Sequence, residues 1–389
     1  MKKKRRLKKK PIIILFSFVL LIIVLFVFIN HDNTNINTNT NTNTNTNINN
    51  SDINKKEEKL DKKEEVIDTK KNLSLVMVGD VLIHEAVFKD ALNSDGSYDF
   101  SSMFEDVKSL LEGYDLRYCN QESIIGGKSL GISGYPNFNS PDEMGDEINN
   151  LGFNLVGLAN NHAYDRGEAA INYSVNYWKK YDNIITAGSY LNSDDRDDLK
   201  IYEKNGIKYA FLAYTTSLNG NKLSKDYLVN MYDKDKVKAD IEKVSEADLI
   251  IVAMHWGNEY TNTPTNSQRE IAEYLASLGV NIIIGTHPHV VQPITYIGDT
   301  LVIYSLGNFI SNQLVIDINP AIGLLVGLDI TKEDDKIKID IKNKELLFAY
   351  SDNSKNFKVI PFSKMSDKYL NNYKEYEEKY MNIVNKELE

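Results

Sequence analysis

The 389-residue sequence is poor in the residues that several common kinds of site require. It has a single cysteine, Cys119, which excludes an intramolecular disulfide framework and any zinc or iron–sulfur site built from several cysteines. A net positive charge is also lacking: residues 2–10 hold eight of the 45 Lys and Arg, so the rest of the chain has 37 basic against 55 acidic residues, and the whole chain carries a formal charge of −10. We therefore expect no nucleic-acid-binding surface, because phosphate contacts need clustered Lys and Arg.

One long hydrophobic run is present over residues 12–29, and only Ser17 interrupts it. Eighteen helical residues extend about 27 Å, close to the hydrocarbon thickness of a bilayer. Polar residues follow the run without the small-residue cleavage site that is typical of a secretory signal. We expect an uncleaved single-pass anchor in the cell membrane over 12–29, with the basic tail over 1–11 cytoplasmic and the remaining chain extracellular. A buried helix of a soluble domain is the alternative.

Residues 30–71 are predicted to form a linker. An Asn/Thr alternation fills 33–50 and cannot bury enough apolar surface to offset its chain entropy. Residues 51–71 are rich in Lys, Glu and Asp and could form either a short charged helix or more linker. The linker would precede a folded domain over 72–365 and a C-terminal helix over 366–389.

Short apolar runs bounded by Gly or Asn alternate with helical patterns in the predicted domain, and such runs are typical of buried strands. We predict strands over 73–78, 116–119, 154–159, 249–254, 280–284 and 301–304. Helices are predicted over 140–152, 169–181, 234–247 and 268–278. This alternation indicates an α/β fold, in which ligands bind beyond the carboxyl ends of the strands.

Residues 321–362 show a different pattern. Three apolar segments, 323–330, 336–341 and 346–350, follow one another with polar turns and no helical pattern between them. This order predicts an antiparallel meander, so the sheet system is expected to be mixed. A helix rich in Lys, Glu and Tyr is expected from about residue 367.

Five of the six histidines lie at or just after predicted strand ends, together with oxygen donors. They are His84, His162, His255, His287 and His289, and the oxygen donors are Asp80, Glu122 and Asn161. Imidazole, carboxylate and amide ligands without cysteine suit zinc, manganese, iron or cobalt better than calcium. A lone histidine at a strand end is more often a capping or core residue. The prediction of a metal site therefore depends on their recurrence at junctions that one sheet edge would gather.

Six motifs follow one another along the chain. They are GD at 79–80, NQE at 120–122, NNHAYDRG at 160–167, HWGNEY at 255–260, GTHPHVVQ at 285–292 and SLGNF at 305–309. Over residues 73–312 this series resembles the CapA family of poly-γ-glutamate capsule synthesis proteins. That family in turn resembles calcineurin-like metallophosphatases, whose four-layer α/β/β/α sandwich holds two metal ions. The resemblance implies this fold, with mixed sheets, in an outward-facing member of a capsule polymer apparatus.

The resemblance also implies two divalent ions, such as manganese, zinc or iron, and a ligand for each position. The implied ligands are Asp80 and His289 for one ion, Asn161, His255 and His287 for the other, and Glu122 as a bridge. His84 stands near the place of the histidine in a metallophosphatase D-x-H motif, but it follows Asp80 by four residues instead of two.

The candidate catalytic residues are His162, whose role the resemblance implies, and Asp165. His162 would be the unligated histidine that protonates a leaving group or stabilises negative charge. Asp165 would orient His162, or would only turn the chain before the next helix. Glu259 is a candidate substrate or supporting carboxylate, or a loop charge. Trp256 and Tyr260 are candidates for a polymer platform or for packing.

Two classes of function stay open from the sequence. The first is a metal-dependent extracytoplasmic hydrolase or transferase acting on poly-γ-glutamate or a related anionic envelope polymer. The second is a non-catalytic accessory subunit that binds nascent polymer and stabilises a complex of capsule synthase subunits at the membrane. A metallophosphoesterase of unknown substrate is a third interpretation, which only the fold-level resemblance supports.

Overall fold

The computed structural model describes residues 70–388. The predicted basic tail, the predicted anchor over 12–29 and almost all of the predicted linker lie outside the described residues. Within 70–388, no helix combines the length and the apolar composition that crossing a bilayer requires.

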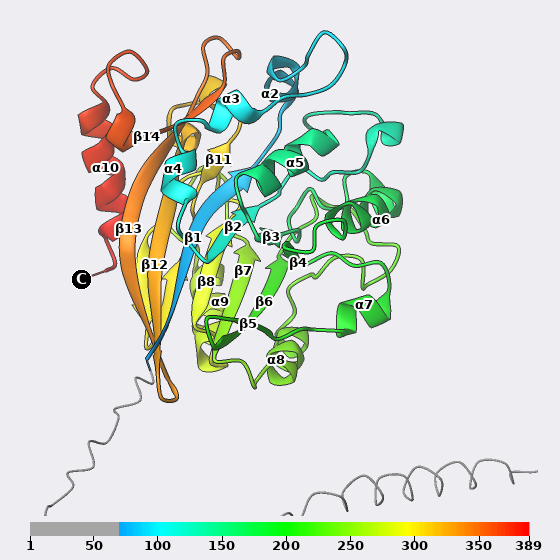
Figure 1. Cartoon of the computed structure of the whole chain (residues 1–389), viewed down its shortest axis with the longest axis vertical. Coiled ribbons are helices and arrows are strands. Elements are labelled where there is room, and N and C mark those ends of the chain that lie inside the picture. The colour runs from blue at the N-terminus through cyan, green and yellow to red at the C-terminus, as the bar shows by residue number, and fades with distance from the viewer. Residues whose placement is uncertain (1–69, 389) are drawn as a thin grey trace, which may run out of the picture. The chain divides into compact units, whose positions relative to one another are not determined.

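Two β-sheets form the centre of the described domain (Figure 1). The first has eight strands in the order β14–β13–β12–β1–β2–β3–β4, with β11 paired to the end of β1. Strands β1 to β4 are parallel, whereas β12, β13 and β14 are antiparallel neighbours. The bounds are Lys71–Val81 (β1), Leu116–Asn120 (β2), Leu155–Gly157 (β3), Ile185–Ala187 (β4), Asn308–Ile310 (β11), Ile322–Glu333 (β12), Lys336–Tyr350 (β13) and Lys358–Pro361 (β14).

The second sheet has six strands in the order β5–β6–β7–β8–β10–β9. Its four inner strands are parallel, and the two edge strands, β5 and β9, are antiparallel to their neighbours. The bounds are Tyr202–Lys204 (β5), Ile207–Thr215 (β6), Leu249–His255 (β7), Ile282–Thr286 (β8), Ile294–Ile297 (β9) and Thr300–Ile303 (β10).

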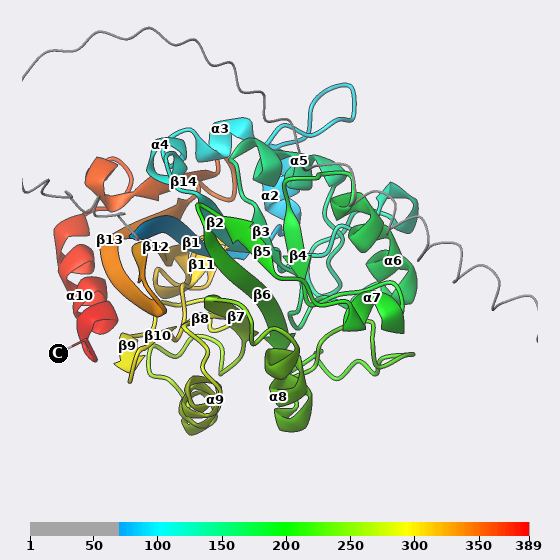
Figure 2. The same cartoon turned by 60° about the horizontal axis from the view of Figure 1, so that its bottom comes forward.

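The two sheets pack face to face, and helices cover their outer faces (Figure 2). Helices α2 to α5 bury apolar side chains against the first sheet, and α8 and α9 do so against the second. Helices α6 and α10 contribute to the central core at opposite edges of the sandwich. The bounds are Glu85–Asp90 (α2), Ser101–Phe104 (α3), Lys108–Leu111 (α4), Asp142–Asn150 (α5), Gly167–Trp178 (α6), Ser193–Asp197 (α7), Lys234–Lys243 (α8), Asn266–Ser277 (α9) and Tyr373–Asn385 (α10).

The predicted α/β architecture with mixed sheets is confirmed, but two details at the C-terminal end were wrong. Residues 336–350 form one strand instead of two. Most of the polar residues between the two predicted segments pair with β12 and so stay in the strand. Because β14 pairs only with 347–350, the earlier part of β13 is an exposed edge where polar side chains can remain. The C-terminal helix begins at Tyr373 and not near residue 367, since Asn372 takes a left-handed φ of 57° that interrupts the helical backbone.

Close approach of two backbones positions the end of β1. Gly79 lies so near the Gly307 carbonyl that an added Cβ would overlap its oxygen. The same carbonyl accepts a hydrogen bond of 3.0 Å from the backbone N–H of Asp80. Glycine at 79 therefore lets β1 and β11 meet where Asp80 leaves the sheet.

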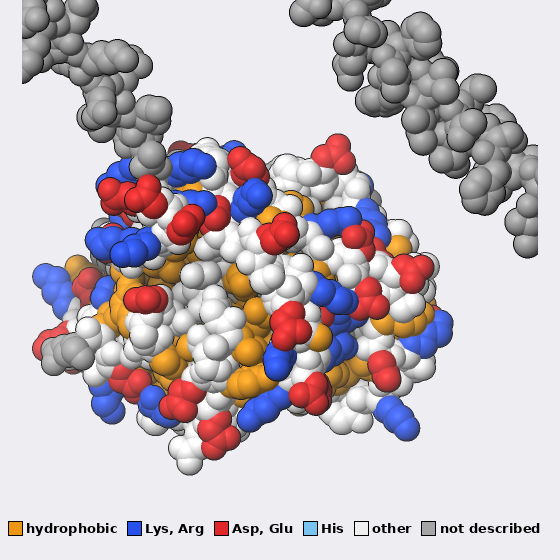
Figure 3. All heavy atoms as spheres, turned by 90° about the horizontal axis from the view of Figure 1, so that it is seen from below, with side chains coloured by type: hydrophobic (Ala, Val, Ile, Leu, Met, Phe, Trp, Pro, Cys, Tyr) orange, Lys and Arg blue, Asp and Glu red, His pale blue; other side chains and the backbone are white. Residues whose placement is uncertain are grey.

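The end of the domain where β1 begins carries interspersed Lys/Arg and Asp/Glu side chains, and Figure 3 shows this face from below. The histidines that the sequence predicts at strand ends lie elsewhere, at or after the carboxyl ends of the parallel strands. The predicted site residues therefore lie at the opposite end of the domain.

Candidate metal centre

The carboxyl ends of four strands bring most of the predicted ligands together. Asp80 is near the end of β1, and Glu122 follows β2 by two residues. His255 is the last residue of β7, and His287 follows β8 directly. Asp80, Glu122 and His255 are almost fully buried, and His287 is partly buried. Strand ends from both sheets therefore place donors from distant parts of the sequence at one site.

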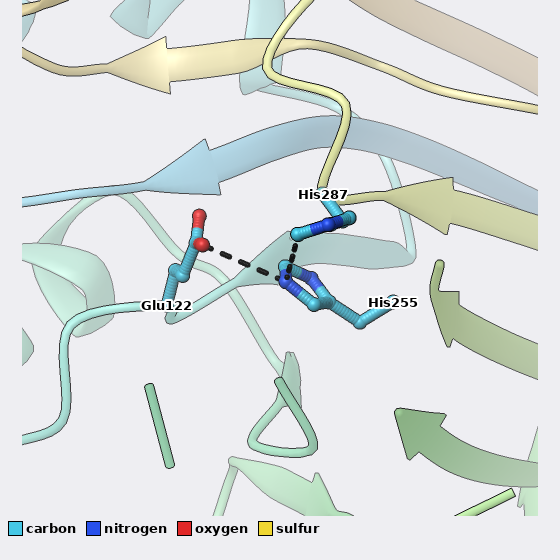
Figure 4. Close-up of side chains that lie close together, drawn as sticks. All are labelled: Glu122, His255 and His287. Atoms are coloured by element: carbon cyan, nitrogen blue, oxygen red, sulfur yellow. Dashed lines mark hydrogen bonds and ion pairs between the residues drawn. The ribbon is translucent and has the colours of Figure 1, made fainter. Parts of the chain in front are cut away.

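Two overlapping groups of side chains have the donor types and spacing to hold metal ions. One is Asp80, Glu122 and His289, and the other is Glu122, His255 and His287; within each group the ligand atoms lie within 4.8 Å of one another. Figure 4 shows the second group, with the Glu122 carboxylate and the His287 ring both facing the ring of His255. Glu122 belongs to both groups, which is the position that the bridging role implied by the resemblance requires.

Glu122 provides a direct test of whether a cation fits this site. Both of its carboxylate oxygens are buried and accept no hydrogen bond from the described residues. The nearest basic atoms are His255 Nε2, 3.5 Å from Oε1, and His289 Nδ1, 3.7 Å from Oε2. A buried carboxylate without hydrogen-bond donors is unfavourable unless a charge or a metal compensates it. The donor set therefore fits a divalent cation.

The ionisation of the group follows from burial and from the neighbouring charges. Burial, and then repulsion from Asp80, raise the pKa of Glu122 well above its ordinary value. Burial lowers the pKa of His255 well below its ordinary value, and it lowers that of His287 to about 4. For His289, burial is outweighed by the Glu122 and Asp80 carboxylates, which raise its pKa to about 9. His255 and His287 are therefore neutral and ready to bind a metal at pH 7, whereas His289 holds a proton.

This difference predicts the pH dependence of metal affinity. The pair formed by His289 and Glu122 must release a proton before an ion binds, because the pKa values of both groups are raised. We expect the affinity for Mn²⁺ to rise by about tenfold per pH unit for each proton displaced between pH 6.5 and 8.5, and to level off above pH 9. Competition with a fluorescent chelator at several pH values measures this. A flat affinity across the interval would contradict the assignment of the protons.

Neighbouring polar side chains orient several of the donors. Asn120 donates to Asp80 Oδ1 at 2.7 Å. Thr286 Oγ1 lies 3.0 Å from His255 Nδ1, and Asn308 Oδ1 lies 3.0 Å from His289 Nδ1. Supports of this kind fix the orientation of metal ligands. Sequence reasoning gave none of these three residues a role in orienting the ligands, although each lies inside one of the six motifs.

Asn161 and His84, two further predicted ligands, lie in different environments. The Oδ1 of Asn161 is 2.8 Å from His255 Nε2, so it lies beside the second group. His84 lies outside both groups: its Nδ1 accepts a 3.2 Å hydrogen bond from the backbone N–H of Asn312, and its ring packs edge-on against Phe138. His84 is the residue that precedes α2, and it lines the same cavity as His162 and His289 without joining either donor group.

His162 and Asp165, the predicted catalytic residues, form a close pair. Asp165 Oδ2 is 2.7 Å from His162 Nδ1 and also accepts a 2.8 Å hydrogen bond from the backbone N–H of Phe138. The Phe138 ring packs edge-on against the imidazole, with centroids 4.7 Å apart. Asp165 therefore orients His162, which the sequence left open as one of two roles.

A cavity of about 600 Å³ adjoins the donors, and His162 and His289 lie in its wall. Glu259 and Tyr260 also line it. Trp256, the other proposed platform residue, is fully buried and donates a 2.9 Å hydrogen bond to the Tyr304 carbonyl, so its role is packing.

Backbone strain occurs in the loops around this cavity. His287, His289 and Tyr260 have positive φ values of 96°, 58° and 61°. Positive φ is unfavourable for residues other than glycine and persists only where the surroundings enforce it. Here the His287 N–H lies 3.3 Å from Asp80 Oδ2, and the Tyr260 N–H donates to the Pro288 carbonyl at 2.8 Å. These three residues adjoin the site, whereas other residues with positive φ, such as Asn372, lie away from it.

Known proteins resemble the chain over this region. Residues 74–313 match the family described as bacterial capsule synthesis protein PGA_cap. The PGA biosynthesis protein CapA of Bacillus subtilis (strain 168) is 32% identical over 170 residues, which is 43% of this chain and 44% of that protein. The capsule biosynthesis protein CapA of Bacillus anthracis is 29% identical over 260 residues, which is 62% of this chain and 61% of that protein. The chain thus matches less than two thirds of the length of either relative.

Solved structures show a more distant likeness. The calcineurin-like phosphoesterase YfkN from Bacillus subtilis has a TM-score of 0.44 and 15% identity, covering 80% of this chain and 98% of that one. The NAD nucleotidase NadN of Haemophilus influenzae has a TM-score of 0.43 and 14% identity, covering 77% of this chain and 54% of that one. The family assignment depends on the sequence match alone, which spans more than half of the chain. The chain belongs to the PGA_cap family of bacterial capsule synthesis proteins.

Proposed function

We propose that this chain is a metal-dependent hydrolase or transferase that acts outside the cell on poly-γ-glutamate or a related cell-envelope polymer. The observation that carries the proposal is the pair of overlapping donor groups that share Glu122. A protein that only holds other subunits together has no chemical need for buried, mutually close carboxylates and imidazoles. Family membership and the names of the two relatives support a capsule polymer as the substrate.

The donors divide naturally between two divalent ions. Asp80, Glu122 and His289 would hold one ion, and Glu122, His255 and His287 would hold the other, with Asn161 beside it. Two such ions supply Lewis-acid polarisation of the bond to be broken and lower the pKa of bound water. The mixed nitrogen and oxygen donors suit manganese, zinc or iron.

His162 supplies proton transfer in this proposal. With its Nδ1 hydrogen-bonded to Asp165, the imidazole presents Nε2 to the cavity that it lines. A proton on Nε2 can pass to the leaving group, which is the amide nitrogen in poly-γ-glutamate. Asp165 is a positioning residue because it acts through the His162 ring that it holds. The Phe138 ring packs against His162 and shields this pair from water.

The Asp165→Asn variant tests this role. We expect kcat to fall by about 100-fold or more, because the amide cannot favour the same imidazole proton arrangement. Metal content and KM should stay close to those of the wild type, since Asp165 belongs to neither donor group. Chain shortening of poly-γ-glutamate, followed by size-exclusion chromatography over a range of pH, measures the effect. Asp340→Asn, at an exposed surface carboxylate, is the control, and equal rates for both variants would contradict the role.

The function as a whole is tested with the purified 389-residue chain. Metal content and polymer chain length are measured for the wild type, Asp80→Asn and His255→Ala, with a generic phosphodiester assayed in parallel. Joint loss of metal and polymer turnover in the variants supports the enzyme. Polymer binding by metal-loaded wild type without turnover of any substrate would instead support the accessory subunit. Turnover of the phosphodiester alone would support a phosphoesterase.

We also propose that residues 12–29 anchor the protein in the cell membrane with the domain outside. The basic tail and the apolar run in the sequence support this arrangement. Protease treatment of intact cells tests it, because the domain should be digested while the N-terminal tail is protected. Protection of the domain in intact cells would contradict the orientation.

A further inference from the structure

We propose that the cavity beside the metal centre binds an uncharged glycan segment, which narrows the polymer class in the function proposed above and depends on that function. The cavity has a volume of about 600 Å³, within the range of sites that enclose small ligands. His162 and His289 lie in its wall, so a polymer bound there passes the donor groups. Three properties of the lining identify the ligand.

The first property is a concentration of exposed apolar side chains. Of the six large hydrophobic side chains that are exposed in residues 70–388, three line this one cavity. They are Tyr135, Tyr260 and Ile316, which are 77%, 42% and 59% exposed. Scattered apolar side chains are normal on a protein surface, but a cluster around a cavity marks a binding site. Flat aromatic faces of this kind match the apolar faces of sugar rings.

The backbone and the hydroxyl group of Tyr260 fix the position of its ring. Its backbone has the strained φ of 61°, and its hydroxyl accepts a 3.2 Å hydrogen bond from Gln313. Its ring centroid lies 6.0 Å from that of His289, so the ring stands next to the first donor group. A ligand stacked on Tyr260 therefore lies beside the metal centre.

The second property is an abundance of carboxamides. Five of them line the cavity: Asn137, Asn219, Asn221, Asn312 and Gln313. Those of Asn137 and Asn221 form no hydrogen bond with any other described residue. A carboxamide both donates and accepts hydrogen bonds, and a sugar hydroxyl does the same. The polar part of the lining thus matches a neutral polyhydroxyl chain.

The third property is the charge of the lining. Within the described chain, no Lys or Arg lines the cavity, whereas the carboxylates of Asp165 and Glu259 do. His289 also lies in the wall, but its imidazole is paired with the carboxylates of Asp80 and Glu122. Together with Asp80 and Glu122, the carboxylates of Asp165 and Glu259 would cancel the charge of two divalent ions. Poly-γ-glutamate carries one carboxylate per unit, and sites for such anions use Arg or Lys. An uncharged glycan requires no cationic partner.

Isothermal titration of the full-length, Mn²⁺-loaded protein tests the preference. The probes are chitotetraose, a neutral tetrasaccharide, and tetra-γ-glutamate, an anionic chain of four units. We expect chitotetraose to bind at least about tenfold more tightly. Equal or tighter binding of tetra-γ-glutamate, or binding of neither probe at millimolar concentration, would overturn the proposal.

Substitutions in the lining give a second readout. Tyr135→Ala and Tyr260→Ala should each weaken chitotetraose binding by about five- to tenfold, as expected for loss of an aromatic contact. Tyr296→Ala is the matched control, because Tyr296 is 41% exposed but lies on β9 outside the cavity. Asn221→Lys should strengthen tetra-γ-glutamate binding about two- to fivefold. If both tyrosine variants bind chitotetraose like the wild type, the proposal is wrong.

These titrations separate this proposal from the enzymatic one. Chitotetraose binding without turnover of any polymer would remove the catalytic function and leave the glycan site. Cleavage of poly-γ-glutamate without chitotetraose binding would support the catalytic function and overturn the glycan site.

Discussion

The Glu122→Gln variant is expected to lose metal binding almost completely while its fold remains intact. Glu122 is the one residue common to both donor groups, so its substitution removes a ligand from each. Loss of a residue that merely supports a ligand lowers metal affinity about 10- to 100-fold, and loss of a shared ligand should exceed this range. Polymer turnover should disappear with the metal. Metal analysis after dialysis and a Mn²⁺ titration measure the change.

The stability of the same variant distinguishes ligand loss from misfolding. At a Mn²⁺ concentration 100 times the wild-type Kd, the ion should stabilise the wild type by about 2.7 kcal/mol and a variant with 100-fold weaker affinity by about 0.4 kcal/mol. Without metal, Glu122→Gln should be at least as stable as the wild type, because it removes a buried carboxylate that lacks donors. Glu147→Gln, at a buried glutamate of α5, is the control and should keep the full metal effect. Full stabilisation of Glu122→Gln by Mn²⁺ would contradict the shared site.

The Gly79→Ala variant should cause the largest loss of stability among the substitutions considered. The added methyl group would overlap the carbonyl oxygen of Gly307, and a backbone atom cannot rotate away as a side chain can. The contact between β1 and β11 must then open, together with the hydrogen bond that Asp80 donates to that carbonyl. We expect the free energy of unfolding to fall by at least about 3 kcal/mol and the metal affinity to fall with it. Urea unfolding with and without Mn²⁺ measures both effects.

A second glycine provides the comparison. Gly279 follows α9 at a φ of 86°, and an added Cβ there would meet no atom within 4 Å. The free energy of unfolding of Gly279→Ala should therefore fall only by the strain of a left-handed alanine, about 1–2 kcal/mol, and its metal affinity should not change. If Gly79→Ala were no less stable than Gly279→Ala, close approach at the end of β1 would not explain the glycine.

The sequence was sufficient to place most of the buried strands, but it missed β6, a buried inner strand of the second sheet. The apolar runs that predicted six strands correspond to β1, β2, β3, β7, β8 and β10, because strands covered on both faces are continuously apolar. The three-residue strands β4 and β11 are too short for any periodicity to identify them. β11 exists because Asn308 pairs with Asp80, more than 200 residues earlier, and such a contact leaves no local signal.

The donors were predictable for a related reason, and the cavity was not. Polar residues that directly follow buried strands must meet at one sheet edge, which identified Asp80, His255 and His287. His84 also follows β1, yet it lines the cavity outside both donor groups, and spacing alone cannot show this. The cavity depends on loops around Tyr135 and Ile316, whose paths are set by tertiary contacts.

The left-handed backbone at His287 and His289 has a consequence for how this loop evolved. Glycine at either position would remove the strain of this backbone conformation. A histidine there instead retains that strain. Selection against strain alone would favour glycine at both positions. The two histidines therefore indicate that backbone strain is tolerated in favour of ion binding.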